Sequence, residues 1–128
     1  MADTAADTGA VADAERLLAR AARYRRCVGY NVATIEGALA RPMGRMAALL
    51  GSWDHADGLF AEALQLHERF GAPYWVARTR LDWADARAAS GREHDAARRD
   101  VRAAVAAAGE RGYGGLLQRG GRVETLLF

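Results

Sequence analysis

Apolar and small side chains recur every three or four residues along most of this chain, which is the spacing that places them on one face of an α-helix. The pattern is clearest over residues 54–70, where six positions form one stripe: Ala56, Phe60, Ala63, Leu64, His67 and Phe70. Similar stripes predict three further helices, over residues 11–28, 74–90 and 92–109. A weaker helix, interrupted by a glycine pair, is predicted over residues 116–127. β-branched residues are too few for a sheet protein, so the sequence predicts an all-α fold.

Pro42 conflicts with the helical pattern around it. It lies inside the stretch of residues 31–50, where a continuous helix would lose a backbone hydrogen bond. Two paths fit: a helix that starts near Arg41 with Pro42 in its first turn, or a short helix over residues 31–40 with a kink or break at the proline. We expect the kink or break.

The helical pattern also repeats along the chain with a period of about 40 residues. Residues 9–29 and 51–71 share one order of glycine turn, small residue, large residue, small residue and closing glycine, and a third copy follows between Gly91 and Gly112. Each unit contains two helices, and alanines at the stripe positions let antiparallel helices approach closely. The sequence therefore predicts antiparallel helical hairpins stacked on one another.

Three segments carry a resemblance to a known family: MGRMAALLGSWD over residues 43–54, FAEAL over 60–64 and RFGAPYWVARTR over 69–80. They are similar to the tetratricopeptide-type (TPR-like) repeats near the C-terminus of large bacterial signal-transduction ATPases. These proteins include LuxR-type transcription factors and adenylate-cyclase-linked ATPases of actinobacteria. The resemblance extends from Gly37 to Leu127.

This resemblance implies a fold and a domain organisation. The fold is a short TPR-like solenoid of about five to six helices. Residues 1–10 would form a flexible N-terminal tail, residues 11–112 the helical repeats, and residues 113–128 a capping helix. Three features depart from the family's pattern, namely Pro42, Asp100 at a usually apolar position, and a degenerate third unit. The small and aromatic signature positions are occupied by Gly44, Ala56, Phe60 and Ala63.

Composition and charge exclude several kinds of chemistry for this chain. The net charge is +2, and all 18 basic residues are arginine. Without lysine the chain has neither a lysine-dependent phosphate-binding loop nor Schiff-base chemistry. No apolar run is long enough to span a membrane, and the small, acidic N-terminus does not resemble a signal peptide. We therefore expect a cytoplasmic, non-enzymatic protein without a cofactor.

Histidine and cysteine give no sign of a metal site or a nucleophile. His55, His67 and His94 lack the spacing of zinc ligands. His67 belongs to the inward stripe, so we expect a buried, hydrogen-bonded structural residue. For Cys27, a packing role within the predicted helix is favoured over a reactive thiol.

The best candidate for binding is a set of charged residues on the first helices of successive units. Arg78, Asp82 and Asp85 share one helix face, and Arg41 and Arg45 lie one unit earlier. Because first helices line the concave surface of TPR-like repeats, the resemblance places all five in the groove. Arginines there would hold a carboxylate or phosphate by bidentate hydrogen bonds. The alternative is a solvated face with weak intrahelical ion pairs.

Two hypotheses of different classes follow. The first is a TPR-like protein–protein interaction or regulatory module that binds a protein or peptide, an adjacent domain of a larger regulator, or a second copy of itself. The second is a small-molecule effector-binding domain or a small helical enzyme, with an aromatic pocket between hairpins. That pocket would be lined by Trp53, Tyr74, Trp75 and Trp83. A nucleic-acid partner is not favoured, because acidic residues dilute the arginine clusters.

Overall fold

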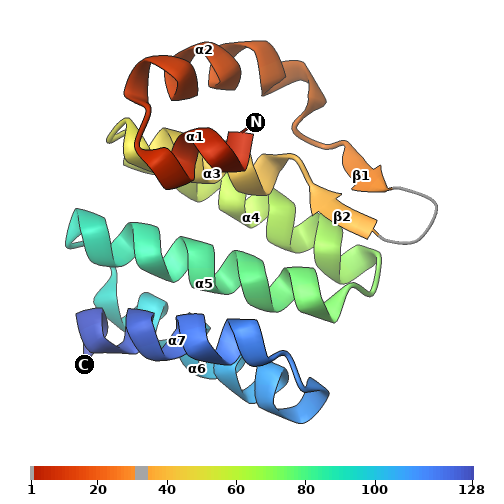
Figure 1. Cartoon of the computed structure of the whole chain (residues 1–128), viewed down its shortest axis with the longest axis vertical. Coiled ribbons are helices and arrows are strands. Elements are labelled where there is room, and N and C mark those ends of the chain that lie inside the picture. Colours follow the sequence, from red (N-terminus) through yellow and green to blue (C-terminus); the bar gives the residue numbers. More distant parts are fainter. Residues whose placement is uncertain (1, 31–34) are drawn as a thin grey trace.

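Seven α-helices make up most of the chain in the computed structural model, which describes residues 2–30 and 35–128 (Figure 1). In chain order they are α1 (Ala2–Thr8), α2 (Val11–Ala21), α3 (Ala40–Leu49), α4 (Trp53–Arg69), α5 (Pro73–Ser90), α6 (His94–Arg111) and α7 (Gly114–Leu127). A 3-10 turn over Ala22–Tyr24 follows α2. Two short antiparallel strands, β1 (Val28–Tyr30) and β2 (Ile35–Ala38), then lead into α3. The all-α prediction is confirmed for this part of the chain, apart from the small hairpin.

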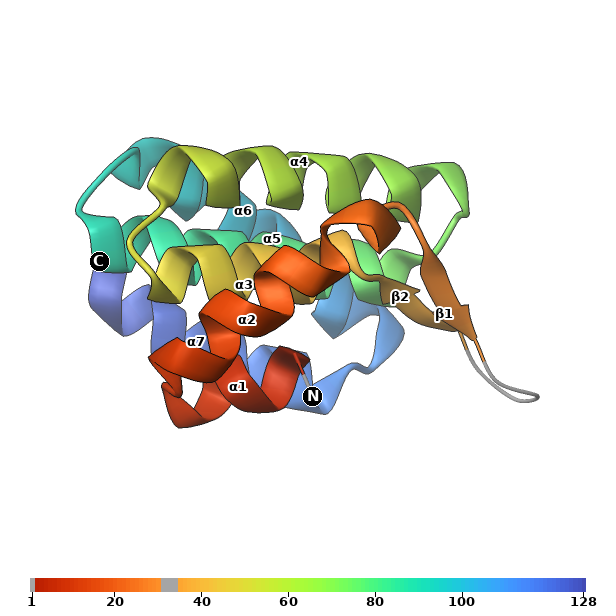
Figure 2. The ribbon, with the colours of Figure 1, turned by 90° about the horizontal axis from the view of Figure 1, so that it is seen from above.

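Helices α3 to α7 pack in chain order, each against the next, and α5 also contacts both α3 and α7. Figure 2 shows α4 and α6 on one side of α3 and α5, and α1 on the opposite side. Both α1 and α2 pack against α3. The N-terminal helix α1 therefore lies over the face of α3 that α4 leaves uncovered.

The core has two parts, one around α3 and α4 and the other among α5, α6 and α7. Many of its positions are alanines, which allow the helices to approach closely. Helices α3 and α4 approach each other closely at Gly44, where an added Cβ atom would lie 3.0 Å from ring carbons of the fully buried Phe60. Ala56 and Ala63 are buried in the same part of the core.

The N-terminal segment differs from the flexible tail that the sequence predicts over residues 1–10. Residues 2–8 form α1, which packs against α3 and places Ala2 and Ala6 on the core. Two aspartates of α1 also form ion pairs with arginines of α3. A helix of this length is unstable in isolation, so tertiary contacts, which periodicity does not reveal, determine its structure.

The kink or break expected at Pro42 is not present in the structure. Helix α3 begins at Ala40, so Pro42 lies in its first turn, where the missing N–H removes no helical hydrogen bond. The expected short helix over residues 31–40 does not form in the described residues, because Ile35–Ala38 are strand β2. Residues 31–34 of that prediction lie outside the described part of the chain.

Two other helices differ from their predictions in extent. The helix predicted over residues 11–28 ends at Ala21, and the chain then turns into β1. Cys27, which we expected to pack within that helix, is exposed. Helix α7 runs without interruption through its central glycine pair, because Gly120 is buried against Val105 of α6 and apolar neighbours anchor both sides of the pair.

Candidate functional site: an arginine–aspartate network

A buried ion pair joins α3 to α5. Arg41 lies in the first turn of α3 and is only 2% exposed, and its Nη1 donates to Oδ2 of Asp82 at 2.8 Å. Asp82 is equally buried on α5. Such a pair is expensive to break, because removal of one partner leaves the other charge in the interior without compensation.

The network continues from Asp82 to α7. The second carboxylate oxygen of Asp82 is paired with Nη1 of Arg119. Nη2 of Arg119 lies 3.9 Å from the exposed carboxylate of Asp85. Asp82 thus receives one guanidinium from α3 and one from α7, and the three helices meet at a single buried carboxylate.

Two carboxylates of α1 bind the arginines of α3 on the side away from Asp82. Asp3 accepts from Nη2 of Arg41 and from Nη1 of Arg45, both at 2.7 Å. Asp7, one helical turn later, accepts from Nη2 of Arg45. The two arginines of α3 therefore hold two carboxylates that are spaced four residues apart on another helix.

These contacts change the acid–base behaviour of the groups. Burial alone would lower the pKa of Arg41, but the charges and hydrogen bonds of Asp82 and Asp3 raise it above its ordinary value. Partial burial alone would raise the pKa of Asp3, but Arg41 and Arg45 outweigh it and lower the pKa. Both shifts favour the ionised form, so Arg41 and Asp3 are charged at neutral pH.

Four of the five predicted groove residues meet in this network: Arg41, Arg45, Asp82 and Asp85. Arg78 does not join it. Its guanidinium lies over the ring of Trp75, 5.4 Å from the centroid. Asp82 pairs with arginines of two other helices, so the weak intrahelical pairs that the spacing allows are not the main contacts of this residue.

Three members of the network were missed in the sequence, namely Asp3, Asp7 and Arg119. Signals for them do exist. The two aspartates stand four residues apart, and Arg119 follows Arg78 at the repeat spacing of about 40 residues. Neither signal indicates which helix faces them, and that contact is tertiary.

The four aromatic residues predicted to line one pocket do not gather around a common pocket beside the network. Trp83 stacks on Phe60 and donates from Nε1 to Asp57 at 2.7 Å. Tyr74 meets Trp75 edge to face, with ring centroids 5.1 Å apart. Of the four, Trp53 lines the open pocket beside the network, and the ring of Trp75 lies beneath the guanidinium of Arg41, 5.4 Å from centroid to Cζ.

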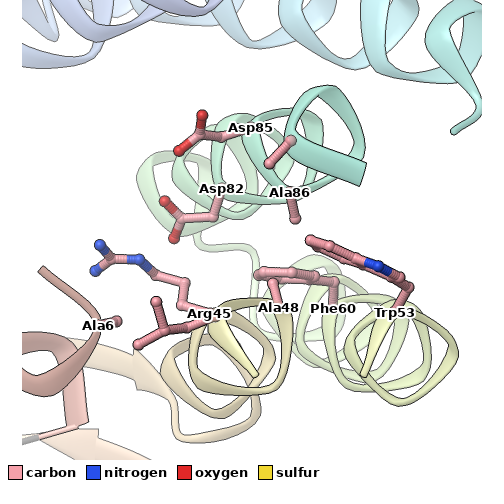
Figure 3. A pocket seen from close by; sticks show the side chains of 10 residues that line it. Ala6, Arg45, Ala48, Trp53, Phe60, Asp82, Asp85 and Ala86 are labelled. Atoms are coloured by element: carbon pink, nitrogen blue, oxygen red, sulfur yellow. The ribbon is translucent and has the colours of Figure 1, made fainter. Parts of the chain in front are cut away.

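That pocket has a volume of about 180 Å³ and lies between α1, α3, α4 and α5. One part of its lining is charged, with Arg45, Asp82 and Asp85, and the rest is apolar. In Figure 3, Ala6 of α1 stands at one end of the pocket, while Trp53 and Phe60 form the far end. The pocket therefore offers an apolar space directly beside the carboxylate-binding arginines.

His67 is buried and hydrogen-bonded, as the sequence predicts. Its Nε2 accepts from the backbone N–H of Ala38 at 2.7 Å, so the proton of the neutral ring is on Nδ1, which lies 3.0 Å from Oγ1 of Thr79. Burial and the nearby charge of Arg41 lower its pKa to about 4. The histidine ties strand β2 to α4 and α5 in its neutral form.

Comparison with family models, with characterised protein sequences and with solved structures finds no match to this chain. Among the described residues, no three His, Cys, Asp or Glu side chains lie close enough together to hold a metal ion. No helix in that part of the chain is both long and apolar enough to cross a bilayer. The interpretation of the site therefore depends on its own geometry.

Proposed function

We propose that this chain is a non-enzymatic, TPR-like protein-interaction module of a bacterial signalling or transcriptional regulator, and that it acts in the cytoplasm. On this proposal, α3–α4 and α5–α6 are stacked hairpins and α7 is the cap. The order of helix contacts supports it, since each helix packs on the next and α5 contacts both α3 and α7. The repeat of about 40 residues supports it as well.

The ligand that this site fits best is an acidic helical segment of a protein. The single observation that carries this is the pair of arginines on α3, whose guanidiniums already hold two carboxylates from a helix distant in sequence. Arg41 is anchored from behind by Asp82, so its guanidinium is oriented before a ligand arrives. A preoriented guanidinium loses little conformational entropy when a carboxylate binds.

The alternative of a small-molecule effector site has less support. It required one pocket lined by four aromatic residues, whereas only Trp53 lines the pocket beside the network. The arginines and the neighbouring apolar space suit a helix that carries both acidic and apolar side chains.

Selection from a library of displayed helical peptides tests the proposal. The bait is the chain with Asp3→Asn and Asp7→Asn, in which the arginines of α3 lack their internal carboxylates. We expect enrichment of peptides with two acidic residues spaced by three or four positions. Binding of these peptides should be lost when Arg45→Gln is added to the bait.

Arg16→Gln serves as the matched control, because Arg16 is exposed and its ion pair within the described residues is with Asp13, three residues away. Peptides selected without acidic pairs, or bound equally well after Arg45→Gln, would overturn the assignment of this face as the binding site.

A further inference from the structure

Helix α1 has the structural features of a ligand bound to the rest of the chain. It has 7 residues, too few for a stable isolated helix. Its described contacts with the rest of the chain include two small apolar side chains on the core, Ala2 and Ala6, and the carboxylates of Asp3 and Asp7 on the arginines of α3. Ion pairs therefore supply much of what holds it in place, and salt and competing anions weaken such pairs.

The link after α1 gives it a point of rotation relative to α2, against which it also packs. Gly9, between the two helices, has φ +68° and no neighbouring atoms within 4 Å of an added Cβ. By contrast, Ala14 of α2 is fully buried, and Leu17 and Leu18 pack on the same part of the core. A change of backbone angles at Gly9 would release α1 while α2 stays packed.

Simple release of α1 is unfavourable. The guanidinium of Arg41 is buried, and without Asp3 its Nη2 would lose its carboxylate. Asp82 would remain a partner of Arg41, but Nη2 would lose a charge-assisted hydrogen bond. A second carboxylate-bearing helix would restore that hydrogen bond, which makes the site suited to exchange.

The pocket shows how an external helix would bind better than α1. Ala6 lines the pocket of about 180 Å³ at its α1 end (Figure 3), and a methyl group is too small to fill a volume of that size. A large apolar side chain at the same position of another helix would enter this space and bury additional apolar surface. The arginines would donate to its flanking carboxylates as they donate to those of α1.

We propose that α1 is an internal ligand that occupies the site, and that a partner helix with the pattern Asp-x-x-(large apolar residue)-Asp displaces it. The inference rests on the proposed function, because it assumes that this face binds a protein segment. It adds the identity of the competing segment and the side-chain pattern of the partner.

A labelled peptide tests the displacement in the complete chain. The peptide has the sequence of residues 2–10 with Ala6→Leu and blocked ends. Fluorescence anisotropy should show about tenfold tighter binding to the chain with Asp3→Asn and Asp7→Asn than to the wild-type chain, because the internal competitor is weakened. A peptide with asparagine in place of both aspartates should not bind.

The matched control carries Asp13→Asn and Asp95→Asn, which remove two carboxylates that pair only with arginines three residues away. This control should bind the peptide as the wild-type chain does. Equal affinity of all three chains, with binding still lost on Arg45→Gln, would overturn the internal ligand and leave the proposed function standing. Absence of binding to the chain without Asp3 and Asp7 would overturn both.

Hydrogen exchange in the wild-type chain gives a second, independent result. Saturating peptide should speed exchange of the backbone amides of residues 2–8 and leave residues 11–21 protected. If the peptide binds while exchange in α1 stays unchanged, α1 is not the segment displaced, and the inference fails.

Discussion

The buried side chains of Arg41 and Asp82 meet at 2.8 Å across the contact between α3 and α5. This ion pair joins the first turn of α3 to the middle of α5. The arginine of one helix thereby neutralises the aspartate of the other. The same carboxylate receives Arg119 from α7, so a single aspartate links all three helices.

Asp82→Asn should strongly destabilise the chain. The substitution keeps the shape of the side chain but leaves Arg41 with a reduced counter-charge in the interior, which should cost about 3 kcal/mol. Asp85→Asn is the control, because Asp85 is exposed and its contact with Arg119 is long. That change should cost less than about 1 kcal/mol. Urea denaturation of both variants measures the difference, and equal costs would contradict a stabilising role of the buried pair.

The stability of the chain should fall with decreasing pH in a window set by His67. Its pKa is about 4 in the folded chain, below the ordinary value of 6.5, so the unfolded chain takes up a proton first as the pH drops. The contribution is fully present above about pH 6.5 and declines toward pH 4, by up to about 3 kcal/mol.

Comparison with His67→Gln isolates this effect. The variant should show a shallower loss of stability between pH 6.5 and 4 than the wild-type chain, while His55→Gln, at an exposed position, should keep the wild-type slope. NMR titration of the His67 ring should give a midpoint near 4. A midpoint near 6.5 would show that the buried hydrogen bond to Ala38 does not hold the ring neutral.

Two adjacent glycines of α7 should respond oppositely to alanine. At Gly120 an added Cβ would lie 2.5 Å from Cγ2 of Val105, so Gly120→Ala should destabilise by about 1 to 3 kcal/mol. At Gly121 nothing lies within 4 Å, and Gly121→Ala should stabilise by about 0.5 to 1 kcal/mol through helix propensity. Thermal unfolding compares the two variants, and effects of the same sign would be inconsistent with the packing of α7 on α6.

Ala6→Leu should stabilise the chain by about 1 kcal/mol, because the longer side chain enters the pocket and buries apolar surface. Ala12→Leu is the control, since Ala12 is exposed on α2 and gains little burial. The melting temperature should rise only for the first variant. An unchanged melting temperature would mean that a side chain at position 6 does not reach the apolar end of the pocket.

Periodicity in the sequence was a good guide where a helix buries one continuous face. The helices predicted over residues 54–70, 74–90 and 92–109 match α4, α5 and α6 to within about two residues. It failed for α1, which is too short for a recognisable stripe. It also failed for β2, whose place in the fold depends on the hydrogen bond from Ala38 to His67.

The sequence predicted that arginines and aspartates form the candidate site, but it identified only some of the residues that meet there. Arg41, Arg45, Asp82 and Asp85 were identified because the resemblance to TPR-like repeats placed them in one groove. Asp3 was not identified, because it reaches the site only through the packing of α1 on α3, which is a tertiary contact.

The sequence by itself determined the helical content and the charged face, because helix propensity and side-chain periodicity are local properties. Only the tertiary structure decided which carboxylates meet which arginines, that Pro42 begins a helix, and that His67 is neutral. Those outcomes depend on burial and on distances between segments far apart in the chain. The energies of contacts between such segments cannot be read from the order of residues within one helix.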